Sequence, residues 1–263
     1  IIKNIRSIQR EDRVDDRPLK FIRADRNEKV DNWEKKIINK IVRSINPREF
    51  TAYFNPLVIK KILSKYAKYL GVSLNNICVF NGGDAVIREF ILFNFKKNLK
   101  VGINDYNYQM YNVYFRLLNI KSYKVKYIFS KTFFNLFEFN KKKFYELLPK
   151  IDIFFLTFPN QISSEDFTLV EFDRILKKYK NKKFFIDESY HGFGHQTFVK
   201  LVKKNKNIFI LRSITKTLGL APHRIGFLIG NKVSLKKYKN FQTPYQLSIF
   251  SGKLLDFFMK NTD

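Results

Sequence analysis

Among the many lysines of this 263-residue chain, Lys216 is the one whose surroundings suggest chemistry. It follows the apolar run "NIFIL", lies close to the hydroxyls of Ser213 and Thr215, and is followed by Arg224. A lysine held against buried apolar surface has a lowered pKa, which makes its amine a nucleophile for Schiff-base formation. The two hydroxyls and the arginine could bind a phosphate group beside it. This stretch therefore predicts a site for amine chemistry on a ligand that carries a phosphate.

A second group of candidate residues follows the apolar run "NICVF", in "NGGDAVIREF". Gly82 and Gly83 allow a sharp turn, and Asp84 could cap the helix that begins there. The backbone N–H groups of Gly83, Asp84 and Ala85 would then lie at a helix N-terminus, an arrangement that binds phosphate. The plainer alternative is an ordinary connection between a strand and a helix. The segment matches neither the nucleotide P-loop nor the dinucleotide-binding glycine motif.

Two further groups also follow apolar runs. Asp187 comes after "KKFFI", and a carboxylate at the end of a buried strand is costly unless it is paired. Tyr190 follows shortly and could point into the same site. The alternative for Asp187 is a helix cap. The tyrosine-rich "NDYNYQMYNVY" follows "LKVGI" and predicts a loop whose rings stack on a planar ligand, the alternative being ordinary surface tyrosines.

These candidate residues would all lie at strand ends of one α/β fold. Short apolar runs alternate with amphipathic segments, which predicts a mostly parallel sheet flanked by helices. The strand candidates are residues 76–80, 99–103, 122–129, 151–158, 182–187, 207–211 and 224–230. Helical patterns occupy residues 33–45, 56–72, 84–95 and 169–180. In open α/β sheets, ligands bind at the carboxyl ends of the strands, so we expect the site there.

The composition is that of a folded globule with an unusual charge. Hydrophobic residues make up 45% of the chain and aromatic residues 17%, while the formal net charge is +27. Such a charge could mark a surface for nucleic acid or anionic lipid, or a general over-use of Lys, Asn, Ile and Phe. We favour the second interpretation because the lysines are spread along the chain. A positive field would still attract an anionic substrate.

The rarer residue types argue against two classes of protein. The one cysteine, Cys78, leaves no internal disulfide, suits a reducing compartment, and is expected to be a small core residue. The three histidines, His191, His195 and His223, lack a cysteine partner set, so we expect no metal site. No apolar run reaches membrane-spanning length and no signal-peptide pattern is present, so we expect a cytoplasmic protein.

In chain order, these groups resemble the fold-type I pyridoxal-phosphate enzymes, most closely the histidinol-phosphate aminotransferase-like branch. The family's T-x-S-K-x-x-G-L-A-G-x-R-x-G is similar to "SITKTLGLAPHRIG", residues 213–226. Its D-E-A-Y-x-x-F is similar to "DESYHGF", and its G-[AS]-D-E is similar to "GGDA". Its P-T-Y-x-x-Y resembles "YNYQMY", and its early R-Y-P resembles "AYF". The resemblance covers about residues 20–250.

The resemblance implies pyridoxal 5'-phosphate as the cofactor and a role for each matching residue. Lys216 would form the Schiff base and move the substrate proton, and Asp187 would keep the pyridine nitrogen protonated. Tyr190 would bond the phenolic oxygen, and Tyr108 would stack on the ring. The phosphate would be bound by Gly83, Asp84, Ala85, Ser213, Thr215, Arg224 and, from the partner in a homodimer, Tyr53.

Two departures from the family pattern matter. The family's N-P-N-N-P-T-G reads "FPNQISS" here, so the asparagine that bonds the phenolic oxygen aligns with Gln161, and Asn160 could serve instead. The arm motif N-E-N-P is echoed only at Asn27 and Glu28. The family's small C-terminal domain carries an arginine that holds the substrate carboxylate, and this chain stops near the start of the link to that domain.

We therefore expect a leading arm at residues 1–40, a pyridoxal-phosphate-binding large domain at 41–240, and the start of a link to a truncated or absent small domain at 241–263. The expected activity is transfer of an amino group between an amino acid, or an amino-phosphate, and a 2-oxo acid. The alternatives are decarboxylation of a phosphorylated amino acid, a catalytically silent protein with this fold, and, with less support, a basic nucleic-acid-binding protein.

Overall fold

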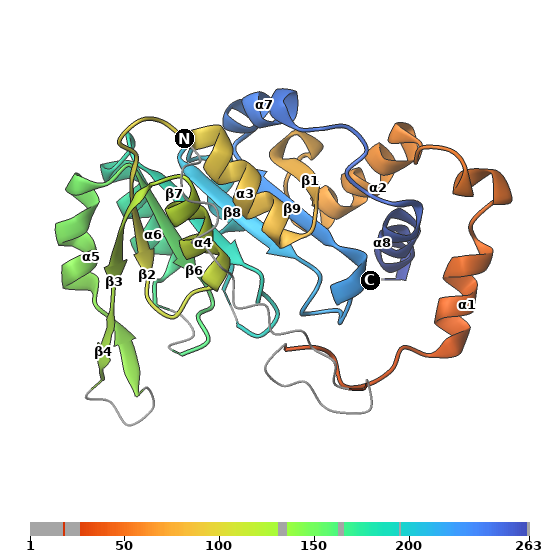
Figure 1. Ribbon diagram of the computed structural model, residues 1–263, viewed down its shortest axis with the longest axis horizontal. Helices are drawn as coiled ribbons and strands as arrows, with labels where there is room; N and C mark the ends of the chain where they lie inside the picture. The colour runs from red at the N-terminus through yellow and green to blue at the C-terminus, as the bar shows by residue number, and fades with distance from the viewer. Residues whose placement is uncertain (1–17, 19–26, 131–135, 163–165, 195, 262–263) are drawn as a thin grey trace.

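One seven-stranded, mostly parallel sheet organises the computed structural model, which describes residues 18, 27–130, 136–162, 166–194 and 196–261 (Figure 1). The strand order is β1-β9-β8-β7-β6-β2-β3, and β9 is antiparallel to both of its neighbours. These strands are β1 (Ile77–Asn81), β2 (Lys100–Asn104), β3 (Lys121–Val125), β6 (Ile153–Thr157), β7 (Lys183–Glu188), β8 (Ile208–Ser213) and β9 (Ile225–Gly230). The predicted α/β fold is confirmed.

Helices cover both faces of the sheet, because parallel strands must be joined by crossover connections. One face is covered by α3 (Gly83–Asn94), α4 (Gln109–Leu117) and α7 (Lys232–Phe241). The other is covered by α2 (Pro56–Tyr69), α5 (Lys141–Leu147), α6 (Leu169–Lys178) and α8 (Ile249–Asn261), and α1 (Lys35–Arg43) packs against α8. In the part of the chain described, none of these helices combines the length and the apolar character needed to cross a membrane.

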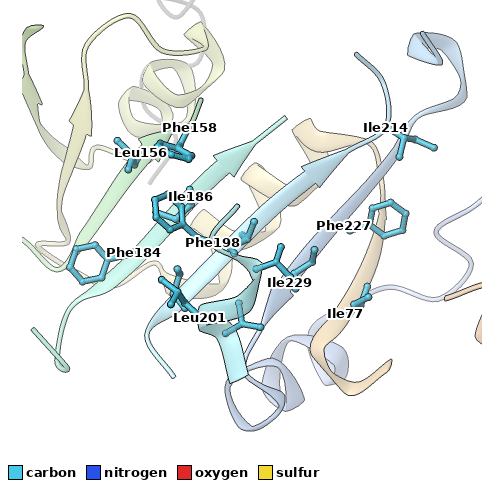
Figure 2. Packing of buried hydrophobic residues seen from close by; sticks show 14 of the residues in the cluster. Ile77, Leu156, Phe158, Phe184, Ile186, Phe198, Leu201, Ile214, Phe227 and Ile229 are labelled. Carbon is cyan, nitrogen blue, oxygen red and sulfur yellow. The ribbon is translucent and has the colours of Figure 1, made fainter. Parts of the chain in front are cut away.

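The two faces carry separate hydrophobic cores, because successive residues of a strand point to opposite sides. In β7, Phe184 and Ile186 belong to one core and Phe185 to the other, and all three are fully buried. Figure 2 shows Phe184, Ile186 and Phe198 among the residues of the first core. Cys78 is buried in the second core, as predicted. A strand buried on both faces consists of a continuous apolar run, which is why the sequence revealed it.

The tyrosine-rich segment after β2 was predicted as a loop, but most of it forms helix α4. Tyr111 and Phe115 lie one helical turn apart, and both are only 1% exposed. Side chains with this spacing share one helix face, so together they bury it against the sheet. No glycine or proline interrupts residues 108–118. Burial of this face therefore decides the helix, and the prediction of a loop was wrong.

The single strand predicted at residues 122–129 is two strands in different sheets. β3 ends at Val125, and β4 (Tyr127–Phe129) pairs with β5 (Phe137–Phe139), a strand that was not predicted. The rings of Tyr127 and Phe139 contact each other, with 5.6 Å between their centroids. Strands of three residues have too short an alternating pattern to be recognised without their partner.

The last helix packs back against the first helical region of the chain (Figure 1). The ring of Trp33 contacts that of Phe258, with 5.2 Å between centroids. A Cβ atom at Gly252 would lie 1.8 Å from the ring of Phe54, so this approach requires glycine. Most of the predicted arm, Ser163 and Ser164 of the family-like motif, and His195 lie outside the described residues.

Candidate active site

Most of the predicted site residues lie at or near one edge of the sheet, and Tyr53 is the exception. The carboxyl ends of β1, β2, β6, β7 and β8 lie there, together with the start of β9. Gly226 pairs with both Phe80 and Ser213, and Asp187 pairs with both Thr157 and Leu211. These pairings bring segments that are far apart in the sequence into direct contact, as expected for a ligand site in a sheet of this kind.

The start of α3 forms a cup that suits an anion. Gly82 precedes the helix with φ of 86°, and the first intrahelical bond runs from the Val86 N–H to the Gly82 carbonyl at 3.3 Å. The backbone N–H groups of residues 83–85 therefore have no carbonyl partner within the helix. A Cβ atom at Gly82 would lie 2.7 Å from Nη2 of Arg224, so the missing side chain lets the guanidinium lie against the turn.

Asp84 does not cap α3, and the prediction that it does was wrong. Gly82 holds the cap position, and Asp84 lies inside the first turn, where its carboxylate cannot serve as the cap. Asp84 Oδ2 instead accepts a hydrogen bond from Arg224 Nη2 at 3.0 Å. The side chain of Arg224 is 41% exposed and that of Asp84 is 39% exposed. The arginine is therefore positioned at the cup and accessible to an incoming anion.

Lys216 lies in the turn that follows β8, between two parts of the site. Ser213 ends this strand, and its Oγ accepts a hydrogen bond from the Thr215 N–H at 3.1 Å. Lys216 itself is partly buried. A Cβ atom at Gly192 would lie 2.5 Å from Cγ2 of Thr217, so the segment after Asp187 packs directly on this turn. The two segments that carry the family-like motifs therefore meet at the turn that holds the lysine.

Asp187 is a buried carboxylate, and no ion pair to it occurs among the described residues. It is 4% exposed; its Oδ2 accepts from the Tyr111 hydroxyl at 2.8 Å and its Oδ1 from the Ser189 N–H at 3.0 Å. Burial raises the pKa of the Asp187 carboxyl, and the bonds from Ser189 and Tyr111 oppose that rise. No helix begins here, so the alternative of a helix cap is wrong. The group is suited to accept a hydrogen bond from a cationic ligand.

Tyr190 contacts the segment that leads into α1. Its hydroxyl accepts a hydrogen bond from Nδ2 of Asn27 at 2.8 Å. A Cβ atom at Gly219, in the turn after Lys216, would lie 2.5 Å from Cβ of Lys29. Residues 27–29 therefore lie against both the tyrosine and the lysine turn, and the sequence had indicated only that Asn27 echoes an arm motif.

Asn160 and Gln161 follow β6, and the structure gives them different environments. Asn160 is 5% exposed; its Nδ2 donates to the Tyr106 carbonyl at 3.2 Å and its Oδ1 accepts from the Ile162 N–H at 2.9 Å. Gln161 is exposed. Tyr108, predicted to stack on the ring, is 44% exposed directly before α4. The Asn160 bond therefore joins the segment after β6 to the segment that carries Tyr108.

Tyr53 lies at the exposed surface near the start of α2. It is 78% exposed, and its ring stacks on that of Tyr245 with 4.3 Å between centroids and 18° between planes. Such a position is compatible with a role towards a partner subunit rather than towards its own chain's site.

A buried ion pair beside the site was missed by the sequence reasoning. Arg212 Nε and Glu188 Oε2 are 2.6 Å apart, and the two residues pair across β7 and β8. Thr197 Oγ1 contacts both side chains, donating to Glu188 at 2.8 Å and accepting from Arg212 at 2.7 Å. Burial, together with the Arg212 charge, lowers the pKa of His191 to about 4. The sequence signal that could have revealed this ion pair is that Glu188 and Arg212, which have opposite charges, stand near the ends of two apolar strands.

This fold and this site define the class of protein. A mostly parallel sheet carries, at its carboxyl edge, a lysine turn, a buried carboxylate and a helix start suited to an anion, the arrangement of fold-type I pyridoxal-phosphate proteins. Residues 23–258 match the family model described as aminotransferase class I and II, and the chain belongs to that family.

Individual relatives agree with this assignment. The chain is 29% identical to a histidinol-phosphate aminotransferase of Clostridium novyi over 247 residues, which covers 92% of this chain and 66% of the relative. It shares its fold with the histidinol-phosphate aminotransferase of Sinorhizobium meliloti solved with pyridoxal 5'-phosphate, with a TM-score of 0.76 and 14% identity. That match covers 89% of this chain and 63% of the solved chain. It also shares its fold with the L-threonine-O-3-phosphate decarboxylase of Porphyromonas gingivalis, with a TM-score of 0.68 and 20% identity. That match covers 87% of this chain and 66% of the decarboxylase. The chain spans 55% to 66% of the length of curated relatives from Sulfurisphaera tokodaii, Buchnera aphidicola and Clostridium novyi.

Proposed function

We propose that this chain binds pyridoxal 5'-phosphate through Lys216 and serves an aminotransferase that acts on an amino acid, or an amino-phosphate, and a 2-oxo acid. The observation that carries the proposal is the convergence of three groups at adjacent strand ends. The Lys216 turn follows β8, and the buried Asp187 lies near the end of the neighbouring strand β7. The cup of residues 82–85, with Arg224, lies beside β9. Membership of the aminotransferase class I and II family supports the reaction class.

The residues present fit this cofactor. A phosphate needs donors and positive charge, which the first-turn N–H groups of α3 and Arg224 would supply. A protonated pyridine nitrogen needs a buried acceptor, which Asp187 supplies. When bound, pyridoxal phosphate supplies an aldehyde that condenses with amines and a ring that accepts electrons released at a substrate Cα.

Each residue then has a task that its position supports. Lys216 would hold the cofactor covalently, and its free amine would move a proton at the substrate Cα. Asp187 would hold the proton on the ring nitrogen, and Tyr108, Tyr190 and either Asn160 or Gln161 would orient the ring and its phenolic oxygen. Charge separated in a partly water-excluded site is stabilised more strongly than in bulk water, so these bonds gain strength from burial.

Two further parts of the proposal concern the assembly and its location. A homodimer is supported by the exposed stack of Tyr53 on Tyr245, since Tyr53 resembles the family tyrosine that reaches the partner's phosphate. Sedimentation of the purified protein at micromolar concentration checks this proposal, and a single monomeric species would contradict it. A cytoplasmic location is supported by Cys78, the one cysteine, which is buried and not in a disulfide.

Absorbance spectroscopy tests the cofactor proposal directly. The parent protein mixed with pyridoxal phosphate should show a band at about 410–430 nm that borohydride fixes to the chain as a stable adduct. Lys216→Ala should lose this adduct entirely. The matched control is Lys203→Ala, which removes an exposed lysine near the end of a short helical turn and should behave as the parent.

The same samples separate the possible reactions. Amino donors should shift the parent's band and release the 2-oxo acid if the chain supports transamination, whereas carbon dioxide release from a phosphorylated amino acid would indicate decarboxylation. Cofactor binding without either product would support a catalytically silent protein. A parent that forms no adduct at millimolar pyridoxal phosphate would refute the proposal.

A further inference from the structure

A tyrosine outside the predicted site residues bonds the carboxylate at the centre of the site. The hydroxyl of Tyr111, in the first turn of α4, lies 2.8 Å from Oδ2 of Asp187 at the end of β7. The two residues are 1% and 4% exposed. Burial and the neighbouring Asp187 charge raise the pKa of Tyr111 well above its ordinary value, so the hydroxyl stays protonated and donates. A buried, charge-assisted bond of this kind is strong and directional.

The geometry gives the carboxylate one fixed rotation. The Ser189 N–H donates to Oδ1, and the Tyr111 hydroxyl donates to Oδ2, so both oxygens are held from different elements. The carboxylate has about four acceptor positions, so the bonds from Tyr111 and Ser189 leave capacity for another donor. No hydrogen bond to Asp187 from a cationic side chain occurs in the described part of the chain. The remaining capacity is therefore available to a ligand that brings its own N–H group.

Packing provides a plainer explanation for Tyr111, and the same core contains a residue that separates the two explanations. Tyr111 packs among Phe115, Phe155 and Phe185. Tyr238 lies in this core too, is 4% exposed, and accepts a hydrogen bond from Asn94 at its hydroxyl. Both tyrosines thus combine a packed ring with one buried hydroxyl bond, but only the hydroxyl of Tyr111 reaches a residue of the site.

We propose that Tyr111 is a positioning residue for the ring nitrogen of the cofactor, because its hydroxyl holds the Asp187 carboxylate in the rotation that accepts the pyridinium N–H. This inference rests on the proposed function. Without the hydroxyl, one oxygen of Asp187 loses its donor in a place with little water. The carboxylate then becomes harder to keep ionised and is free to rotate, and both changes weaken its bond to the ring nitrogen.

Tyr111→Phe removes the hydroxyl and keeps the ring, so it isolates this bond. The apoprotein is titrated with pyridoxal phosphate and, separately, with the analogue that has C–H in place of the ring nitrogen. We expect the variant to bind pyridoxal phosphate about 5- to 20-fold more weakly than the parent. For the analogue, which offers Asp187 no N–H, the affinities should agree within about twofold. Tyr238→Phe should match the parent for both ligands.

Each outcome decides the inference. Equal losses for the two ligands, or no loss for either, would show that Tyr111 acts only through packing and would overturn the proposal. The double variant Tyr111→Phe/Asp187→Asn should bind pyridoxal phosphate as Asp187→Asn alone does, and an additional loss would also overturn it. Guanidinium denaturation establishes that each variant is folded. A parent that binds neither ligand would refute the proposed function itself, which is a distinguishable result.

Discussion

Asp187 and Glu188 are neighbours at the end of β7, are both buried, and have opposite surroundings. Asp187 faces the α3 and α4 side and receives hydrogen bonds from Tyr111 and Ser189, which are both uncharged. Glu188 faces the other side, where Arg212, Thr197 and the Phe198 N–H together bond its two oxygens. Because side chains alternate along a strand, a shift of one residue changes the environment completely.

Glu188 and Asp187 differ in whether the protein itself meets their needs. Glu188 has a full set of protein partners, including a cation, so nothing further is required of it. Asp187 has only uncharged donors, from Tyr111 and Ser189, and no cationic partner among the described residues. A buried charge without a counter-ion is costly, and this supports the proposal that a ligand supplies the counter-charge to Asp187.

Removing Glu188 should produce the largest effect on stability. Glu188→Ala leaves the Arg212 guanidinium buried and unpaired, which should cost about 3–5 kcal/mol of the free energy of unfolding. Chemical denaturation of the apoprotein measures this change. A loss below about 1 kcal/mol would show that Arg212 finds another partner and that the pair is not structural.

A paired replacement serves as the control for this experiment. Glu188→Met/Arg212→Met removes both charges and keeps apolar volume, so the double variant should recover at least half of the lost stability. Cofactor affinity, measured on the folded protein, should fall less in the double variant than in any variant of Asp187. The opposite order would break the distinction between the two carboxylates.

Replacing Asp187 should have a small effect on stability and a large effect on the ligand. Asp187→Asn preserves shape and removes a buried charge, so the free energy of unfolding of the apoprotein at neutral pH should change by less than about 1 kcal/mol or rise. The affinity for pyridoxal phosphate should fall about 10- to 100-fold, since a charge-assisted bond becomes a neutral one. Titration by absorbance, beside the denaturation curve, checks both expectations.

The pH dependence of stability provides the smallest and finest test. Burial raises the pKa of Asp187 in the folded apoprotein, whereas in the unfolded chain the carboxyl titrates near its ordinary value of about 4. Between these two values the folded state holds the proton more tightly, so this group's contribution to stability falls as the pH rises. Asp187→Asn does not titrate, so its stability should fall less over that window. Parallel pH profiles for the two proteins would contradict the raised pKa.

Much of the fold and most of the candidate site could be predicted, for a local reason. Strands buried on both faces are continuous apolar runs, so β7 and β8 were recognisable from their own residues. Lys216, Asp187 and Gly83 each follow such a run, and parallel strands must end at one edge. What failed was non-local: α4 depends on a helix face that only the sheet buries, and β4 depends on its pairing with β5.

The sequence by itself determined which side chains stand at the strand ends, because strand type and motif spacing are properties of short segments. The tertiary structure alone decided what those side chains contact. The bond from Tyr111 to Asp187 joins residues separated by 76 positions, and the bond from Arg212 to Glu188 joins residues separated by 24. Both depend on strand order and on the face to which each side chain points. Those features come from packing the whole sheet at once, so no single segment encodes them.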